Sequence, residues 1–236
     1  MSKRIILLVG QGGAGKNTMA DLWTKHFGAA QVEISDPFKE MVHEIFRIPR
    51  EILWGPTELR DAELQPLEFK KPISVDCRQW AADILQDKGD TSKAARDLGD
   101  YIQGLGLRWD AGDPLTARDI CQAIATDWAI AHNPFVWADK AIAAARANPA
   151  KTVVIPGGRN VHEIDRVHEA GGKVILIRRA NGGLKDPRLL ANSSEAAMMQ
   201  VPVWKYDEVV NNNGTRGQYL RKCLELGEMY CSTEET

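Results

Sequence analysis

The sequence predicts an α/β fold, in which helices cover both faces of a parallel sheet and a mostly helical segment is inserted. Short apolar runs at residues 4–9 and 152–155 are typical of strands buried on both faces. Segments with apolar residues at helical spacing follow these runs, and strands that alternate with helices build a parallel sheet. A length of 236 residues suits one such domain with an insertion.

The first fifty residues predict two strands and two helices. The strand at residues 4–9 ends in a glycine-rich turn, and apolar positions then recur at helical spacing over residues 16–26. A short strand is expected at residues 31–34. Asp36-Pro37 begins a helix through Ile48, because aspartate accepts from free N–H groups and proline suits the first turn.

The middle of the chain is predicted to be helical. Residues 49–72 are rich in proline and charge, which indicates an irregular segment around a short helix at residues 58–64. Residues 106–114 are expected to form a loop. Further helices are expected at residues 75–86, 92–105, 116–131 and 135–147.

The last third returns to alternating strands and helices. The strand at residues 152–155 should end at Pro156-Gly157-Gly158, and the polar, glycine-rich residues 181–192 fit a mobile surface segment. The other elements are a helix at 160–170, a strand at 174–177, a strand at 208–210 and a helix at 218–229.

The composition narrows the class of protein. The chain has 30 Lys and Arg residues and 32 Asp and Glu residues, and this near-neutral balance argues against a protein that binds along a nucleic-acid backbone. The four cysteines form no C-x-x-C pair, so neither a zinc site nor a disulfide framework is expected. No stretch is long and apolar enough for a signal peptide or a membrane span. We therefore expect a cytoplasmic protein with no metal site of its own, either monomeric or a homodimer.

Residues 10–16 carry the strongest signal in the sequence. Gly10-Gln-Gly-Gly-Ala-Gly15-Lys16 fits G-x-x-x-x-G-K and lies between a predicted buried strand and a predicted helix. In such a loop successive backbone N–H groups point at a phosphate, the helix N-terminus adds partial positive charge, and the lysine reaches the β- and γ-phosphates. The sequence therefore predicts an ATP site formed by Gly12, Gly13, Ala14, Gly15, Lys16, Asn17 and Thr18.

The residue after the lysine narrows the kind of ATP-binding protein. Asn17 stands where the standard motif has the Ser or Thr that ligates Mg²⁺, and a hydroxyl follows only at Thr18. A hydroxyl displaced by one residue is the pattern of nucleoside monophosphate kinases, which hold Mg²⁺ mostly through water and substrate phosphates. We therefore expect ATP and Mg²⁺ in a small-molecule kinase rather than in a GTPase or a motor ATPase.

Several segments in the same order resemble the phage-type deoxynucleoside monophosphate kinases. Residues 15–21 (G-K-N-T-M-A-D) are similar to that family's G-K-D-T-x-A-D, and residues 36–40 to its D-P-x-K-E. Residues 118–127 resemble its R-x-L-x-Q-x-L-G-T-D. The match continues through Trp137, residues 155–163 (a strand-end P-D-x-R followed by H-E), Gly171-Gly172, Arg179, Ser194-Glu195 and residues 210–215.

The resemblance implies a single P-loop kinase domain in the host cytoplasm of a phage. Its core would lie at about residues 1–48 and 150–236, its helical acceptor-binding region at about 49–149 and its lid at about 180–192. The enzyme would use ATP to convert deoxynucleoside 5′-monophosphates to diphosphates. Catalysis would fall to Lys16, Arg159 and Arg179, and Arg188 would join the ATP site. The acceptor would contact Asp36, Lys39, Arg118, Gln122, Thr126, Trp137, Arg159 and Glu163, with Arg60 as a further phosphate-binding candidate.

These roles suit the residue types. Arg118 and Arg159 offer planar forks for monophosphate oxygens, and Gln122 can both donate to and accept from a base edge. Trp137 can stack on the base. Arg179 and a lid arginine would bring positive charge to the transferring phosphoryl group.

Two positions depart from the family pattern and leave alternatives open. Gly157 stands in place of an aspartate, so that either Asp36 or Glu163 compensates or the acceptor differs, and Ala125 replaces a glycine. One alternative is a kinase that acts on a hydroxyl of a modified pyrimidine, free or within DNA. Another is an ATP-binding protein that transfers nothing.

Overall fold

The computed structural model describes residues 3–70, 75–86, 89–158, 160–180 and 201–232. The chain divides into two compact units. We call Met1–Ile34 with Ala138–Thr236 the sheet unit, and Ser35–Trp137 the helical unit. Whether they act as one kinase domain stays a prediction.

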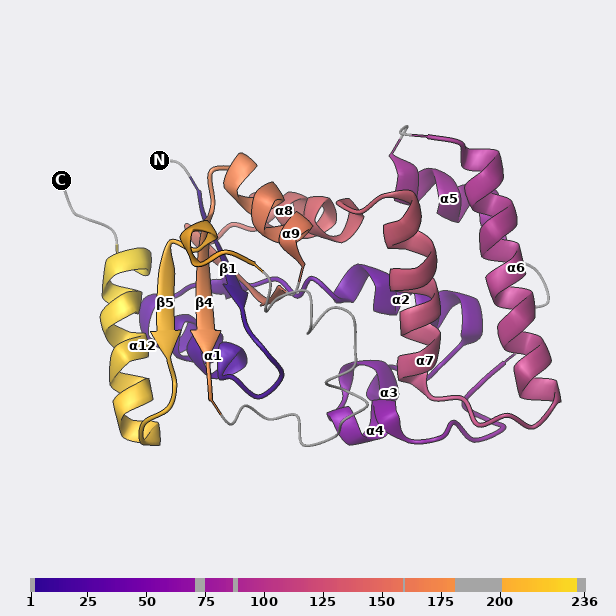
Figure 1. Ribbon diagram of the computed structural model, residues 1–236, viewed down its shortest axis with the longest axis horizontal. Coiled ribbons are helices and arrows are strands. Elements are labelled where there is room, and N and C mark those ends of the chain that lie inside the picture. The colour runs from indigo at the N-terminus through magenta and orange to yellow at the C-terminus, as the bar shows by residue number, and fades with distance from the viewer. Residues whose placement is uncertain (1–2, 71–74, 87–88, 159, 181–200, 233–236) are drawn as a thin grey trace. The chain divides into compact units, whose positions relative to one another are not determined.

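The sheet unit contains a five-stranded parallel sheet in the order β2-β3-β1-β4-β5 (Figure 1). The central strand β1 is buried over five of its six residues. A parallel strand with helices on both sides is expected to be apolar throughout, which explains the unbroken Ile-Ile-Leu-Leu-Val run. The strands are β1 (Arg4–Val9), β2 (Ala30–Gln31), β3 (Thr152–Gly158), β4 (Lys173–Arg178) and β5 (Glu208–Asn211).

Helices cover both faces of this sheet, which confirms the predicted α/β fold. One core joins α1 (Lys16–Phe27) and α12 (Arg216–Cys231) to alternate strand residues such as Ile6 and Leu8. The Trp23 indole in this core donates to the carbonyl of Cys223 at 2.7 Å. On the other face α9 (Val161–Glu169) packs against β4 and β1 through buried Ile164 and Val167. The unit also contains most of α8 (Val136–Ala147) and a short 3₁₀ helix, η2 (Val203–Lys205).

One carboxylate joins several elements at the end of the sheet where β4 begins. Asp207 accepts from Lys173 Nζ at 2.7 Å and from the Val174 N–H at 2.8 Å, and it lies 3.0 Å from His168 Nε2. Burial alone would raise the pKa of Asp207, but the hydrogen bonds from Lys173, Val174 and His168 outweigh it and lower the pKa. The ionised form of Asp207 therefore stabilises the folded sheet unit.

The helical unit is held together by aromatic side chains. Phe69 lies between Phe46 and Trp109, with ring centroids 5.5 and 4.6 Å away, and the buried Trp128 indole donates to the carbonyl of Ala94 at 2.9 Å. The helices are α2 (Asp36–Phe46), α3 (Arg50–Trp54), α4 (Thr57–Asp61), α5 (Cys77–Leu85), α6 (Thr91–Asp110), α7 (Ala117–Cys121) and the π-helix η1 (Gln122–Ile130).

Three element predictions are corrected. Helix α6 continues to Asp110 where a loop was expected, and the Trp109 ring on Phe69 stabilises this added turn. Strand β3 continues through Gly158 rather than ending at Ile155, because an irregularity in its pairing with β1 accommodates the Pro-Gly sequence. The expected helix at 116–131 is an α-helix only to Cys121 and then a π-helix.

Candidate functional site

The glycine-rich loop between β1 and α1 turns sharply into the first turn of the helix. Gly10, Gly13 and Gly15 have φ angles of 153°, 71° and 114°, and the Ala14 N–H donates to the carbonyl of Gln11 at 3.1 Å. Among the described residues no side chain caps the N-terminus of α1, and its first turn carries no acidic residue. The first N–H groups of this helix are therefore available to an external anion.

The lysine of the loop is folded back over it. Lys16 is only 7% exposed, and its Nζ donates to the carbonyls of Gly10 and Gln11 at 2.6 and 2.9 Å. Its ammonium group therefore lies at the mouth of the loop rather than in bulk solvent.

Residues from distant parts of the sheet unit brace this loop. The Tyr219 hydroxyl donates to the carbonyl of Gly15 at 2.7 Å, and Asn212 Nδ2 donates to the carbonyl of Ala14 at 2.8 Å. Burial raises the pKa of Tyr219, so it stays a neutral donor. Sequence reasoning missed Tyr219, which no local pattern marks.

The structure brings Arg179, a predicted catalytic residue, to the same loop. Its Nη1 donates to the carbonyl of Gly13 at 3.2 Å, and its side chain is exposed. Arg179 follows directly on β4, whose end lies at the same sheet edge as the loop after β1. A cation thus lies at the glycine-rich loop, and its catalytic role stays a prediction.

The segment after β2 brings to the end of β3 a carboxylate that sequence reasoning did not single out. Gly157 has φ of 105°, and a Cβ built there would lie 3.7 Å from Ile34 Cγ2 and 4.0 Å from Glu33 Oε2. This backbone conformation disfavours any residue with a side chain, including aspartate. Glu33 therefore supplies a carboxylate next to the place where the aspartate of the resembling family would begin. Neither periodicity nor a motif marks Glu33.

The two carboxylates predicted to compensate both accept hydrogen bonds within their own units. Glu163 is 7% exposed and closes a capping box on α9, where its oxygens accept from the backbone and side-chain nitrogens of Asn160 at 2.8 and 3.1 Å. Asp36 Oδ1 in the helical unit accepts from Trp54 Nε1 at 2.8 Å. Acceptor binding by either residue stays a prediction.

Three cations predicted to contact the acceptor lie near Cys121 in the helical unit. Burial raises the pKa of the Cys121 thiol to about 11, against the opposing influence of nearby Lys39, Arg60 and Arg118. These three side chains come from α2, α4 and α7, so the cluster is a product of tertiary packing. Such a concentration of positive charge is suited to a phosphate group.

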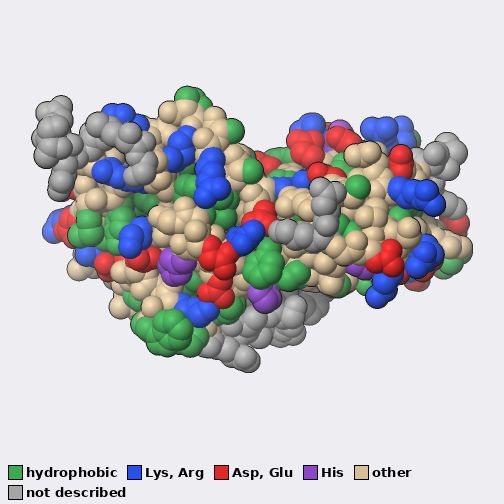
Figure 2. Space-filling model, turned by 90° about the horizontal axis from the view of Figure 1, so that it is seen from above, with side chains coloured by type: hydrophobic (Ala, Val, Ile, Leu, Met, Phe, Trp, Pro, Cys, Tyr) green, Lys and Arg blue, Asp and Glu red, His purple; other side chains and the backbone are tan. Residues whose placement is uncertain are grey.

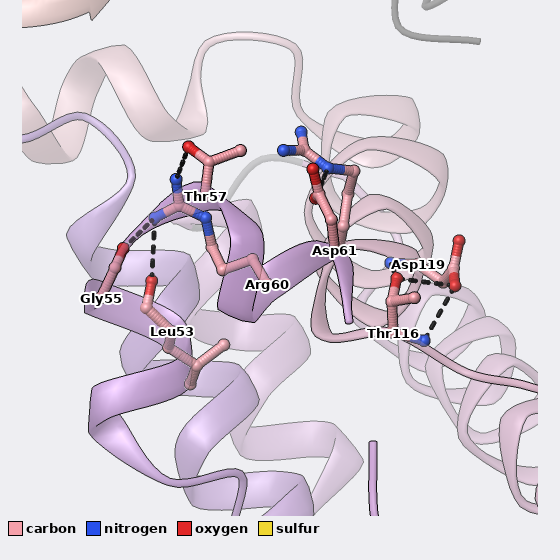
Figure 3. Close-up of polar contacts among 8 residues, drawn as sticks. Leu53, Gly55, Thr57, Arg60, Asp61, Thr116 and Asp119 are labelled. Carbon is pink, nitrogen blue, oxygen red and sulfur yellow. Dashed lines mark hydrogen bonds and ion pairs between the residues drawn. The ribbon is translucent and has the colours of Figure 1, made fainter. Parts of the chain in front are cut away.

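Both arginines of this group are held by hydrogen bonds, and Figure 3 shows those of Arg60. Arg60 Nη1 donates to the carbonyls of Leu53 and Gly55, both at 3.3 Å, and its Nη2 donates to Thr57 Oγ1 at 3.1 Å. Arg118 Nε donates to Asp61 Oδ1 at 2.5 Å. Arg60 therefore joins α3 to α4 in addition to any role in binding.

The remaining acceptor candidates of the helical unit lie on the π-helix η1 and at the start of α8. Gln122 Nε2 donates to Asp127 Oδ1 at 3.2 Å, a contact five residues apart, and Thr126 lies partly exposed on the same helix. Trp137 is 5% exposed, and its indole donates to the carbonyl of Ala125 at 2.9 Å. Its ring edge packs on Phe38, so Trp137 contributes to the core, and its role at the base stays a prediction.

Some predictions lie outside the described residues. These are Arg159, Arg188 and the lid from residue 181 onward. Within the described ranges no group of three or more His, Cys, Asp or Glu side chains is arranged to hold a metal ion. No helix in the described part of the chain combines the length and apolarity needed to cross a bilayer.

Comparison with known proteins gives likeness of structure only. No protein-family model and no curated protein matches the chain. Among solved structures it is similar to dephospho-CoA kinase from Campylobacter jejuni, at 17% identity over 97% of this chain and 98% of that one, with a TM-score of 0.39. It is also similar to the protein TT1252 from Thermus thermophilus, at 15% identity over 99% and 100% of the two chains and a TM-score of 0.38. A sugar kinase from Janibacter sp. matches at 14% identity over 98% and 99%, with a TM-score of 0.37. At these scores the likenesses carry no inference about activity or substrate.

Proposed function

We propose that this protein is a P-loop kinase that transfers the γ-phosphate of ATP to a deoxynucleoside monophosphate. The observation that carries the proposal is the loop at residues 10–16, with Lys16 folded over it and the N-terminus of α1 left without a side-chain cap. Backbone amides, helix dipole and lysine together form a site for the polyphosphate of a nucleoside triphosphate.

The loop residues suit the donor nucleotide. Lys16 and the first amides of α1 would hold the β- and γ-phosphates, and Arg179 would stabilise charge on the transferring group. Mg²⁺ would be held mostly through water and the substrate phosphates, whose charge it neutralises when bound. The braces from Tyr219 and Asn212 keep the loop in one conformation, so that little ordering is needed on binding.

The cation cluster of the helical unit supports a phosphorylated acceptor. Lys39, Arg60 and Arg118 would bind its monophosphate, whose oxygens are nucleophilic at neutral pH without a strong general base. The surface seen in Figure 2 has Lys and Arg side chains interspersed with Asp and Glu, which suits a small ligand better than a nucleic-acid backbone.

A first experiment identifies the acceptor. ATP consumption is measured with each of the four deoxynucleoside monophosphates and their ribose counterparts. Turnover that depends on one of them, with the corresponding diphosphate as product, supports the proposal. Slow ATP hydrolysis unaffected by any nucleotide would instead identify an ATP-binding protein that transfers nothing.

A matched pair of lysine variants tests the donor site. Lys16→Ala is expected to lower turnover by about 10²–10³-fold, because a preorganised cation on the transferring phosphate is removed. Lys25→Ala, on the exposed last turn of the same helix, should leave turnover unchanged. Equal activity of the two variants would refute the assignment of the ATP site.

Glu33 favours a second candidate, a kinase that acts on a hydroxyl of a pyrimidine nucleotide. Transfer to a hydroxyl needs a general base, and this carboxylate lies at the edge of β3, beside the strand that leads into the phosphate loop. Under this alternative Glu33→Gln abolishes transfer to hydroxymethyl pyrimidine nucleotides. If the accepting group is instead a phosphate, Glu33→Gln should have only a mild effect on the rate of transfer.

A further inference from the structure

The ion pair between Asp61 and Arg118 is built into the backbone around it. Asp61 is the last residue of α4, and Arg118 lies in the first turn of α7. Beyond the pair, the Leu64 N–H donates to the carbonyl of Leu115 at 2.8 Å, and an antiparallel bridge joins Glu63 to Thr116. Two segments far apart in the sequence are thereby clamped where the two side chains meet.

The start of α7 is fixed as well. Thr116 and Asp119 form a capping box, in which Asp119 Oδ2 accepts from the Thr116 N–H and hydroxyl at 2.9 and 2.8 Å, and the Asp119 N–H donates to Thr116 Oγ1 at 3.1 Å (Figure 3). A capping box holds the first turn of a helix in one conformation. The direction in which Arg118 leaves the helix is therefore set independently of any ligand.

The contact to Asp61 uses one particular donor of the guanidinium group. Arg118 Nε donates to Asp61 Oδ1 at 2.5 Å, and within the described part of the chain the two terminal nitrogens make no other hydrogen bond or ion pair. About a third of each side chain is exposed, 33% for Arg118 and 34% for Asp61. A guanidinium held at Nε still presents a planar pair of terminal NH₂ groups, which match two oxygens of a phosphate.

We propose that Asp61 is a positioning residue that holds Arg118 by its Nε, so that both terminal NH₂ groups face the phosphate of the acceptor. The inference rests on the proposed function and adds the residue that sets the geometry of its acceptor site. Without this contact the long arginine side chain would sample several rotamers, and the entropy lost in ordering it would lower the affinity for the acceptor. The carboxylate also offsets part of the repulsion among the clustered cations.

The test compares Asp61→Ala, Asp61→Asn, Arg118→Ala and the double variant Asp61→Ala/Arg118→Ala. The probe is whichever of dAMP, dGMP, dCMP and dTMP gives the highest turnover, and kcat and KM are measured for it and for ATP. Asp113→Asn is the matched control, since it removes an exposed carboxylate of the same unit that pairs with Arg108 and not with Arg118. Thermal unfolding of every variant separates loss of fold from loss of positioning.

Asp61→Ala is expected to raise the KM of the acceptor by about tenfold, as when a hydrogen bond to a charged group is lost, and to leave the KM of ATP unchanged. Asp61→Asn should stay within about threefold of the wild type, because its amide oxygen can still accept from Nε. Asp113→Asn should leave both KM values unchanged.

The double variant distinguishes the possible failures. If Asp61 acts through Arg118, its removal adds nothing to the effect of Arg118→Ala. The inference is overturned if Asp61→Ala behaves as wild type. It is also overturned if Asp61→Ala raises the KM of the acceptor as much in the Arg118→Ala background as it does alone. If Arg118→Ala itself leaves the KM of the acceptor unchanged, the acceptor site of the proposed function fails, and the role of Asp61 with it.

Discussion

Replacement of Gly15 by alanine tests the geometry of the phosphate loop most directly. Gly15 has φ of 114°, and a Cβ built on it would lie 2.8 Å from the Cε1, Cζ and hydroxyl oxygen of Tyr219. The added methyl group would therefore meet both an unfavourable backbone conformation and a buried ring. The hydrogen bond from the Tyr219 hydroxyl to the carbonyl of Gly15 would be displaced at the same time.

The expected loss of stability follows from these two terms. A residue with a side chain in a sparsely populated backbone region costs about 1–3 kcal/mol. Forcing an extra methyl group into a packed site costs about 1–3 kcal/mol more. Gly15→Ala should thus lower the free energy of unfolding by about 2–6 kcal/mol, and displacement of the loop amides should weaken Mg-ATP binding by at least about tenfold.

The measurements are urea unfolding and calorimetry with Mg-ATP. Gly28→Ala is the control at the other end of α1, because Gly28 has φ of 64° and nothing lies within 4 Å of its built Cβ. That variant should lose only about 1–2 kcal/mol and keep its affinity for Mg-ATP. The double variant Gly15→Ala/Tyr219→Ala has no steric clash between the added methyl group and the ring. Compared with Tyr219→Ala alone, it should lose only the stability that the unfavourable backbone conformation at position 15 costs. Wild-type stability and Mg-ATP affinity in Gly15→Ala would refute the reasoning.

Three further substitutions test contacts that the structure shows. Asp207→Asn should lower the free energy of unfolding by about 2 kcal/mol at neutral pH. Because the pKa of Asp207 is lowered in the folded state, this difference from wild type should be complete above pH ~4 and should vanish as the pH falls through the folded pKa. Urea unfolding at a series of pH values measures it. Tyr219→Phe should lose about 1 kcal/mol and change Mg-ATP affinity by less than tenfold, since the ring still supports the loop, as calorimetry would register. Trp137→Phe should lose about 1 kcal/mol with its indole hydrogen bond, and an unchanged KM for the acceptor would show that the residue serves the core alone.

Local sequence was sufficient for the parts of this protein whose structure depends on near neighbours. The apolar run of β1, the glycine-rich turn and the helix from Lys16 are adjacent in the chain, and the structure has them as predicted. Their physical basis is short-range, since periodicity, glycine φ angles and helix termini are all decided within a few residues. The alternation of such units then indicated the parallel sheet.

Other features were invisible because they depend on contacts between distant segments. The π-helix at Gln122–Ile130 differs from the expected α-helix by hydrogen-bond register alone, which composition does not encode. The Pro-Gly sequence, which typically interrupts a strand, continues β3 because Pro156 and Gly158 still pair with Leu8 and Val9 of β1. The short strand expected at residues 31–34 is β2 at Ala30–Gln31, and a two-residue strand is too short for periodicity to give its bounds.

The sequence by itself thus determined the fold class and the phosphate loop with its lysine. Only the tertiary structure decided what surrounds them: Tyr219 on Gly15, 204 residues away in the chain, Glu33 beside Gly157, and Asp61 on Arg118 across 57 residues. The physical reason is the range of the interactions. A turn or a helix is specified by its neighbours along the chain, whereas the orientation of a functional side chain is specified by whatever the packing of other elements places against it.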